Sequence, residues 1–118
     1  MPILVAAYTI LAIAAGGRAG IQLATKAGEA PVPYALSAVA AAVYLTLAIA
    51  LRRPARWRRV AIAAACAELA GVLAVGSAEA FGIVDWPDET VWSGYGAGYG
   101  WAPLVLPVAA LVVLRSPR

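Results

Sequence analysis

The sequence predicts an all-α membrane protein with four transmembrane helices and both termini in the cytoplasm. The first observation behind this prediction is composition: 64% of the 118 residues are hydrophobic and only 13% are charged. Soluble globular domains are about 45–50% apolar and about 25% charged. The second observation is that apolar stretches of roughly 15 to 20 residues run without a polar face, as a helix in lipid requires.

Hydrophobicity divides the chain, taken as one domain over residues 1–118, into four spans joined by short connections. Each span is long enough, or nearly so, to cross an apolar core of about 30 Å. The last is the weakest, because its apolar run is only about 13 residues and contains Pro103 and Pro107, so upstream glycines or a kinked helix must supply length. The predicted spans are Ile3–Thr25, Pro33–Leu51, Arg59–Phe81 and Trp101–Leu114.

A cleavable signal peptide is the competing interpretation of the first span. No Lys or Arg precedes the apolar stretch, and Arg18 falls inside it, which is unlike a signal peptide. We therefore expect the first span to be a helix of the folded protein.

The distribution of charge predicts the orientation. Basic residues gather in the second connection and at the C-terminus, and cytoplasmic loops are the ones enriched in Lys and Arg. The connection after the third span is acidic, and the connection after the first span holds one basic and one acidic residue. The residues are Arg52, Arg53, Arg56, Arg58, Arg59, Arg115 and Arg118 on the cytoplasmic side, and Lys26, Glu29, Asp85, Asp88 and Glu89 on the outer side.

Arg18 and Glu68 are the candidate functional residues, because an ionisable side chain inside a membrane span is costly unless it is paired or hydrated. Helix rise places Glu68 about 14 Å and Arg18 about 22 Å from the cytoplasmic ends of their spans, a difference that an arginine side chain can cover. We expect Glu68 to be buried and paired with Arg18. Gln22 lies one turn beyond Arg18 as an accessory polar residue, and Glu79, near the outer end, is an alternative partner.

Two interpretations of these charges stay open. In the functional one, Arg18 and Glu68 form a coupled ion pair, or Glu68 is a proton-binding carboxylate, in a transport path. In the structural one, the pair fixes the packing of the first and third helices, or Arg18 extends towards the headgroups.

Several kinds of chemistry are excluded by what the chain lacks. It has no histidine and one cysteine, Cys66. Imidazole-based catalysis, haem or zinc ligation by histidine, and a disulfide within the chain are therefore excluded. We predict no cofactor, no metal and no catalytic constellation.

The segment before the last span is the most distinctive part of the chain. Its carboxylates and aromatic side chains predict an ordered stretch against the outer membrane surface, with tryptophan and tyrosine rings among the headgroups. Its alternating glycines permit backbone conformations closed to other residues. Calcium is the alternative role for the carboxylates, but it needs about six to eight oxygens in a defined loop. The residues are Asp85, Trp86, Asp88, Glu89, Trp92, Tyr95 and Tyr99.

The chain resembles a group of small four-helix actinobacterial integral membrane proteins of unassigned function. The resemblance lies in residues 58–60 (Arg-Arg-Val), 66–73 (Cys-Ala-Glu-Leu-Ala-Gly-Val-Leu), 86–93 (Trp-Pro-Asp-Glu-Thr-Val-Trp-Ser) and 103–107 (Pro-Leu-Val-Leu-Pro). It implies a four-helix fold and a location in the plasma membrane, and it implies no activity.

Two functions from different classes follow from these features. The first is a small homo-oligomeric transporter or channel-like protein that uses Glu68 and Arg18. The second is a non-catalytic accessory or assembly subunit of a larger membrane complex. The expected partners are the lipid bilayer and either a second copy or another membrane protein, since small residues four apart, such as Gly16 and Gly20, let helices approach closely. No nucleic-acid partner is expected, because the basic residues are explained by orientation.

Overall fold

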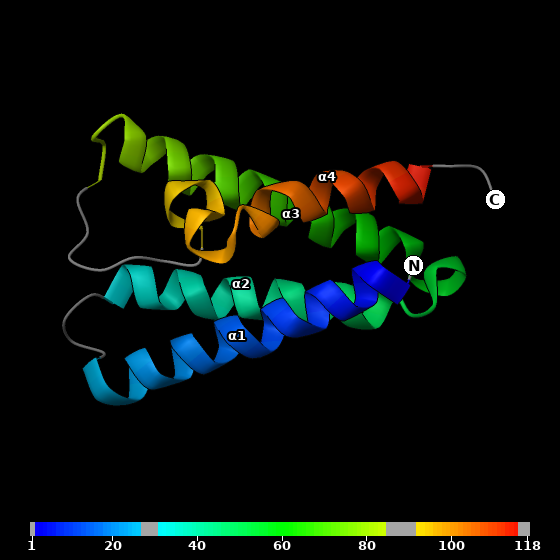
Figure 1. The fold of residues 1–118 in the computed structure, drawn as a ribbon, viewed down its shortest axis with the longest axis horizontal. Helices are drawn as coiled ribbons and strands as arrows, with labels where there is room; N and C mark the ends of the chain where they lie inside the picture. The colour runs from blue at the N-terminus through cyan, green and yellow to red at the C-terminus, as the bar shows by residue number, and fades with distance from the viewer. Residues whose placement is uncertain (1, 27–30, 85–91, 116–118) are drawn as a thin grey trace.

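The protein consists of α-helices arranged in two layers (Figure 1). The computed structural model describes residues 2–26, 31–84 and 92–115. Helices α1 and α2 form one layer, and α3 and α4 with the short 3₁₀ segment η1 form the other. The bounds are α1 Pro2–Lys26, α2 Pro31–Ala50, α3 Pro54–Ala80, η1 Ser93–Tyr99 and α4 Ala102–Arg115. The all-α class and four helices at the predicted places along the chain are confirmed, apart from an earlier start of α3.

Proline begins three of the helices. Pro2, Pro31 and Pro54 occupy first helical positions, where a missing N–H costs nothing and the fixed φ angle suits the helix. Helix α3 therefore starts five residues before the predicted Arg59, and much of the expected charged turn is helical. Arginine is a good helix former, so nothing in this stretch opposes the helix after the proline. The only irregularity there is at Trp57, whose φ of −109° and ψ of 20° kink the first turns of α3.

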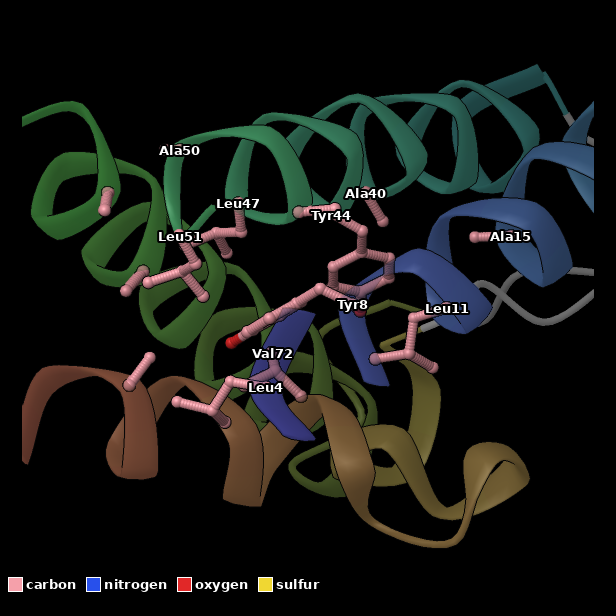
Figure 2. Close-up of a cluster of buried hydrophobic side chains, with 14 of the residues drawn as sticks. Leu4, Tyr8, Leu11, Ala15, Ala40, Tyr44, Leu47, Ala50, Leu51 and Val72 are labelled. Atoms are coloured by element: carbon pink, nitrogen blue, oxygen red, sulfur yellow. The ribbon is translucent and has the colours of Figure 1, made fainter. Parts of the chain in front are cut away.

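The core lies between the two layers and mixes tyrosines with small residues. Tyr8 on α1 and Tyr44 on α2 are completely buried, and Figure 2 shows their side chains meeting between these helices, with Val72 of α3 nearby. Alanines line the α2 and α3 faces and allow the helices to approach closely. The fully buried alanines are Ala15, Ala40, Ala61, Ala65 and Ala110.

Two helices are long and apolar enough to cross a membrane within the described residues, at Pro2–Ile21 and Ala55–Ala80. Only 28% of the first span and 33% of the second is buried inside the molecule, so neither resembles the enclosed core helix of a soluble protein. The apolar helices Tyr34–Ala50 and Ala102–Arg115 are shorter. Length and composition therefore indicate two membrane-spanning helices where the sequence predicted four.

The segment before α4 has a left-handed backbone. Gly94, Tyr95 and Gly96 have φ angles of 58°, 59° and 83°, a region that glycine enters freely and tyrosine only under strain. The predicted role of the alternating glycines in special backbone conformations is confirmed at Gly94 and Gly96, and Tyr95 between them shares the left-handed conformation. These residues belong to η1, which packs against α3 and α4. Helix α4, which follows, is only about 21 Å long.

An arginine of α3 caps the end of α4. Arg58 donates hydrogen bonds from Nε, at 2.9 Å, and from Nη2 to the backbone carbonyl oxygen of Leu114. Carbonyls in the last turn of a helix lack intrahelical partners, and a cation there also interacts favourably with the helix dipole. Arg58 thus fixes the C-terminal turn of α4 to the start of α3.

This contact predicts unequal effects for two neighbouring arginines. Arg58→Ala is expected to lower the free energy of unfolding by about 1 kcal/mol, because a charge-assisted cap is lost. Arg59→Ala, at an exposed position for which the structure shows no such contact, is the matched control and should change stability by less than about 0.5 kcal/mol. Unfolding in detergent with added denaturant measures both, and equal losses would contradict the assignment.

Candidate functional site

Glu68 lies in the middle of the buried face of α3. The buried residues of that helix follow a spacing of three and four, as on a helix face that packs against others. All members except Glu68 are apolar, and the Glu68 side chain is 0% exposed. The face consists of Ala61, Ala65, Glu68, Val72 and Val75. The predicted burial of Glu68 is confirmed.

The hydrogen-bonding partner of Glu68 is Tyr8. The Tyr8 hydroxyl donates to Glu68 Oε1 at 2.8 Å, across the interface between α1 and α3. The second carboxyl oxygen, Oε2, is buried and has no hydrogen-bonding partner among the described residues. One neutral donor and one oxygen without a partner are unusual around a buried acid, since buried polar atoms are nearly always satisfied.

The structure does not pair Glu68 with Arg18, and the predicted partner is therefore corrected. Arg18 follows Tyr8 by ten residues on α1, which places it about 15 Å further along the helix axis. Tyr8 has the register that faces Glu68, so Arg18 is too far along α1 for its side chain to make this contact. Arg18 is partly buried and makes an interaction of its own. The side chain of Gln22 lies outside the part of the chain that the structure describes.

A second tyrosine and a tryptophan continue the polar contacts from Tyr8. The rings of Tyr8 and Tyr44 are inclined at 37°, with centroids 6.1 Å apart. Trp92 Nε1 donates to the Tyr44 hydroxyl oxygen at 2.9 Å. Four side chains, from α1, α2, α3 and the residue before η1, thus meet between the layers, and two hydrogen bonds cross from one layer to the other. We call Tyr8, Tyr44, Glu68 and Trp92 the interlayer cluster.

Trp92 is packed inside the protein and does not anchor in the headgroups as predicted. It is 4% exposed, and its ring lies directly against Gly71 of α3, where an added Cβ would be 2.6 Å from a ring carbon. Glycine removes the side chain that would otherwise fill this place, and Tyr44 provides the acceptor that the indole N–H needs when buried. The space at Gly71 and the acceptor on Tyr44 therefore both favour the inward position of the indole.

Glu79 holds the start of η1. Its Oε2 accepts a hydrogen bond from Ser93 Oγ at 2.8 Å, and its Oε1 accepts one from the Gly94 backbone N–H at 3.0 Å. Glu79 therefore has a structural task that the sequence did not indicate, and the hydrogen bonds that the structure shows for it are to η1, with none to Arg18.

Tyr95 is also directed towards α3 and not towards the headgroups. Its hydroxyl lies 3.1 Å from Ser77 Oγ, and its ring covers Gly76. The aromatic side chain and the Glu79 carboxylate together secure the left-handed turn. The remaining predicted residues of this segment, Asp85, Trp86, Asp88 and Glu89, and the side chain of Tyr99, lie outside the described part.

Tyr8 and Tyr44 were not among the residues predicted from the sequence, although the sequence holds a signal for Tyr8. Tyr8 shares a three-and-four spacing with Leu4, Leu11 and Ala15, all on the buried face of α1. A tyrosine on such a face needs a hydrogen-bonding partner, and an acid on the buried face of another helix is a natural one. The sequence contained both halves of this contact, but not the helix register that brings them together.

No protein-family model, no curated protein and no solved structure matches the chain. Within residues 2–26, 31–84 and 92–115, no group of three histidine, cysteine or acidic side chains is placed to hold a metal ion. The chemistry available in the interlayer cluster is that of one carboxyl, two phenols and an indole.

Proposed function

We propose that this protein is a small multi-pass membrane transporter or channel-like protein in which Glu68 binds and releases a proton. The observation that carries the proposal is the Glu68 carboxyl, which is fully buried, accepts one hydrogen bond from Tyr8 and has no partner at Oε2 within the described parts of the chain. A permanently charged carboxylate with so little compensation is costly at this depth. Binding and release of a proton would give Glu68 Oε2 a function, because this oxygen is free to take up the proton.

A proton suits this site better than a metal cation. Hard cations such as calcium need about six to eight oxygen ligands, and magnesium needs near-ideal octahedral geometry. Glu68 and Tyr8 supply three oxygens, and the adjoining residues of the α3 face are Ala65 and Val72, which supply none from their side chains. A proton needs only one acceptor, which Oε2 provides.

The surface of the helices supports the location in a membrane. Large apolar side chains project outward along α1, including Ile3, Ile10, Ile13 and Ile21. The exposed threonines Thr9, Thr25 and Thr46 donate their hydroxyls to backbone carbonyls four residues earlier on the same helix. These outward hydroxyls are satisfied without water, as lipid requires.

All four helices are proposed to lie in the membrane, with the arginine-rich end in the cytoplasm. The starts of α1 and α3 and the ends of α2 and α4 lie at the same end of the molecule (Figure 1), so their arginines fall on one side. The short α4 is extended by η1, whose irregular backbone is packed against α3 and α4. Irregular backbone is tolerated at membrane depth when protein covers it.

The direct test is proton flux in proteoliposomes under an imposed pH gradient. Glu68→Gln keeps an oxygen for the Tyr8 hydroxyl but cannot exchange a proton, so the flux is expected to fall at least about 10-fold, as for loss of a group that transfers the proton itself. Glu79→Gln is the matched control and should retain the flux, since Glu79 serves η1. Equal flux through wild type and Glu68→Gln, or wild-type flux no greater than through empty liposomes, would overturn the proposal.

An accessory or assembly subunit is the second candidate. Phe81 and Ile83 follow the end of α3 and are 79% and 75% exposed, and exposed apolar side chains outside a helix are suited to a partner protein. Stoichiometric co-purification of a different membrane protein favours this candidate. A homo-oligomer that carries the flux by itself favours the transporter.

A further inference from the structure

We propose that the turn between α2 and α3 binds the phosphate of an anionic phospholipid headgroup. The site consists of Arg52, Arg53, Arg56 and Arg59 together with Trp57, and we call it the arginine corner. The proposal rests on the membrane location proposed above and is independent of any role of Glu68.

The positive charge of the arginine corner has no counter-charge among the described residues. Its four arginines are exposed. The two acidic side chains that the structure describes are Glu68, buried against Tyr8, and Glu79, which lies near the opposite end of α3 and bonds to η1. The corner therefore keeps a positive field that attracts anions, and the anionic lipids of a membrane are the nearest concentrated source.

The start of α3 adds a second attraction for phosphate at the same place. Arg53, the residue before the helix, makes no side-chain hydrogen bond to the first turn, and no acidic residue lies in that turn. The N–H groups of Arg56 and Trp57 already donate to the Arg53 carbonyl at 3.1 Å and 3.0 Å, so the attraction comes from the positive end of the dipole of this 27-residue helix, which no acidic residue of the first turn offsets. The guanidinium groups and the helix start act on the same ligand.

The position of Trp57 favours a lipid over a free anion as the ligand of the arginine corner. It is 39% exposed, and the Arg56 guanidinium carbon lies 5.5 Å from the centroid of its ring. An indole at a helix end prefers the headgroup region, with its apolar body towards the acyl chains. The kink of α3 at Trp57 places this ring beside the arginines, so one ligand with a phosphate and an apolar tail satisfies both.

Arg58 stabilises the structure of the arginine corner and is not one of the residues proposed to bind the lipid. Its hydrogen bonds to the Leu114 carbonyl fix the end of α4 beside the start of α3. Arg115, the next residue, is exposed and extends the positive surface. Variants for testing therefore retain Arg58.

The test is thermal unfolding of the purified protein in neutral detergent during titration with dioctanoyl phosphatidylglycerol. A ligand that binds only the folded state raises the unfolding temperature, and the rise grows with the logarithm of the ligand concentration once this exceeds the Kd. The wild type is expected to be stabilised by this lipid and not by dioctanoyl phosphatidylcholine. The combined variant R52Q/R53Q/R56Q should bind phosphatidylglycerol at least about 10-fold more weakly, because each arginine contributes about 1 kcal/mol near an anionic surface.

The variant R52K/R53K/R56K preserves the charge and serves where the glutamine variant does not fold. It should bind several-fold more weakly, since lysine lacks the two-pronged guanidinium contact with phosphate. Glu68→Gln should bind like the wild type, which separates failure of this proposal from failure of proton transport. Equal stabilisation by both lipids, undiminished affinity in the arginine variants, or equal stabilisation by inorganic phosphate would each overturn the proposal.

Discussion

Gly71→Ala is expected to destabilise the protein by about 1–3 kcal/mol, the range for overfilling a packed core. The new Cβ would lie 2.6 Å, 2.7 Å and 3.0 Å from three carbons of the Trp92 ring. The ring cannot easily move aside, because Trp92 is buried and its indole N–H donates to Tyr44. The free energy of unfolding, measured with denaturant in detergent, gives the result.

Gly17→Ala is the matched control for this substitution. Gly17 lies in α1, is exposed, and an added Cβ there meets nothing within 4 Å. Alanine is favoured over glycine inside a helix by about 0.5–1 kcal/mol, so Gly17→Ala should stabilise the protein or leave it unchanged. The same exchange thus has opposite signs at the two positions. A Gly71→Ala protein as stable as Gly17→Ala would show that Trp92 does not pack against α3.

Tyr8→Phe is expected to lower the free energy of unfolding by about 1–2 kcal/mol, because it removes the one hydrogen bond that the described residues give to a buried carboxyl. Glu68→Leu should also destabilise, since the Tyr8 hydroxyl is left without its acceptor. The double variant should recover much of this loss, as apolar replacement of both buried partners often does. A double-mutant cycle is therefore expected to give a coupling energy of about 1 kcal/mol or more.

Arg18 supplies the comparison for this cycle. Because the structure does not pair Arg18 with Glu68, the effects of Arg18→Gln and Glu68→Leu should add to within about 0.5 kcal/mol. Additive effects of Tyr8→Phe and Glu68→Leu, combined with strong coupling between Arg18 and Glu68, would restore the ion pair expected from the sequence and contradict the contact seen here.

Helix positions could be predicted from the sequence because they depend on local signals. Apolar stretches placed the four helices, and Pro31 and Pro33 marked the start of the second. The start of α3 was missed by five residues, because arginines read as a turn are also good helix formers after Pro54. The number of helices that cross a membrane could not be fixed in the same way, because apolar length is marginal in α2 and α4.

The candidate site was predicted in part. The burial of Glu68 follows from its position among apolar residues, and it was found. Its partner was not found, because depth counted along separate helices cannot give their relative rotation and offset, which packing between the layers decides. The inward position of Trp92 depends on Gly71, which its ring contacts but which lies 21 residues earlier in the chain, and no local pattern connects the two.

The proposed transport function requires Glu68 to be a proton-exchanging carboxyl bonded to Tyr8 inside the bundle. Carbon-13 solid-state NMR of the protein in lipid bilayers tests it most directly, with the Glu68 Cδ resonance assigned by its loss in Glu68→Gln. We expect a through-space correlation between Glu68 Cδ and Tyr8 Cζ, and a Cδ resonance that moves as the pH is varied between about 4 and 10, the range across which perturbed carboxyl groups titrate. A Cδ resonance that stays constant over that range, or that correlates with Arg18 Cζ instead of Tyr8, would contradict it.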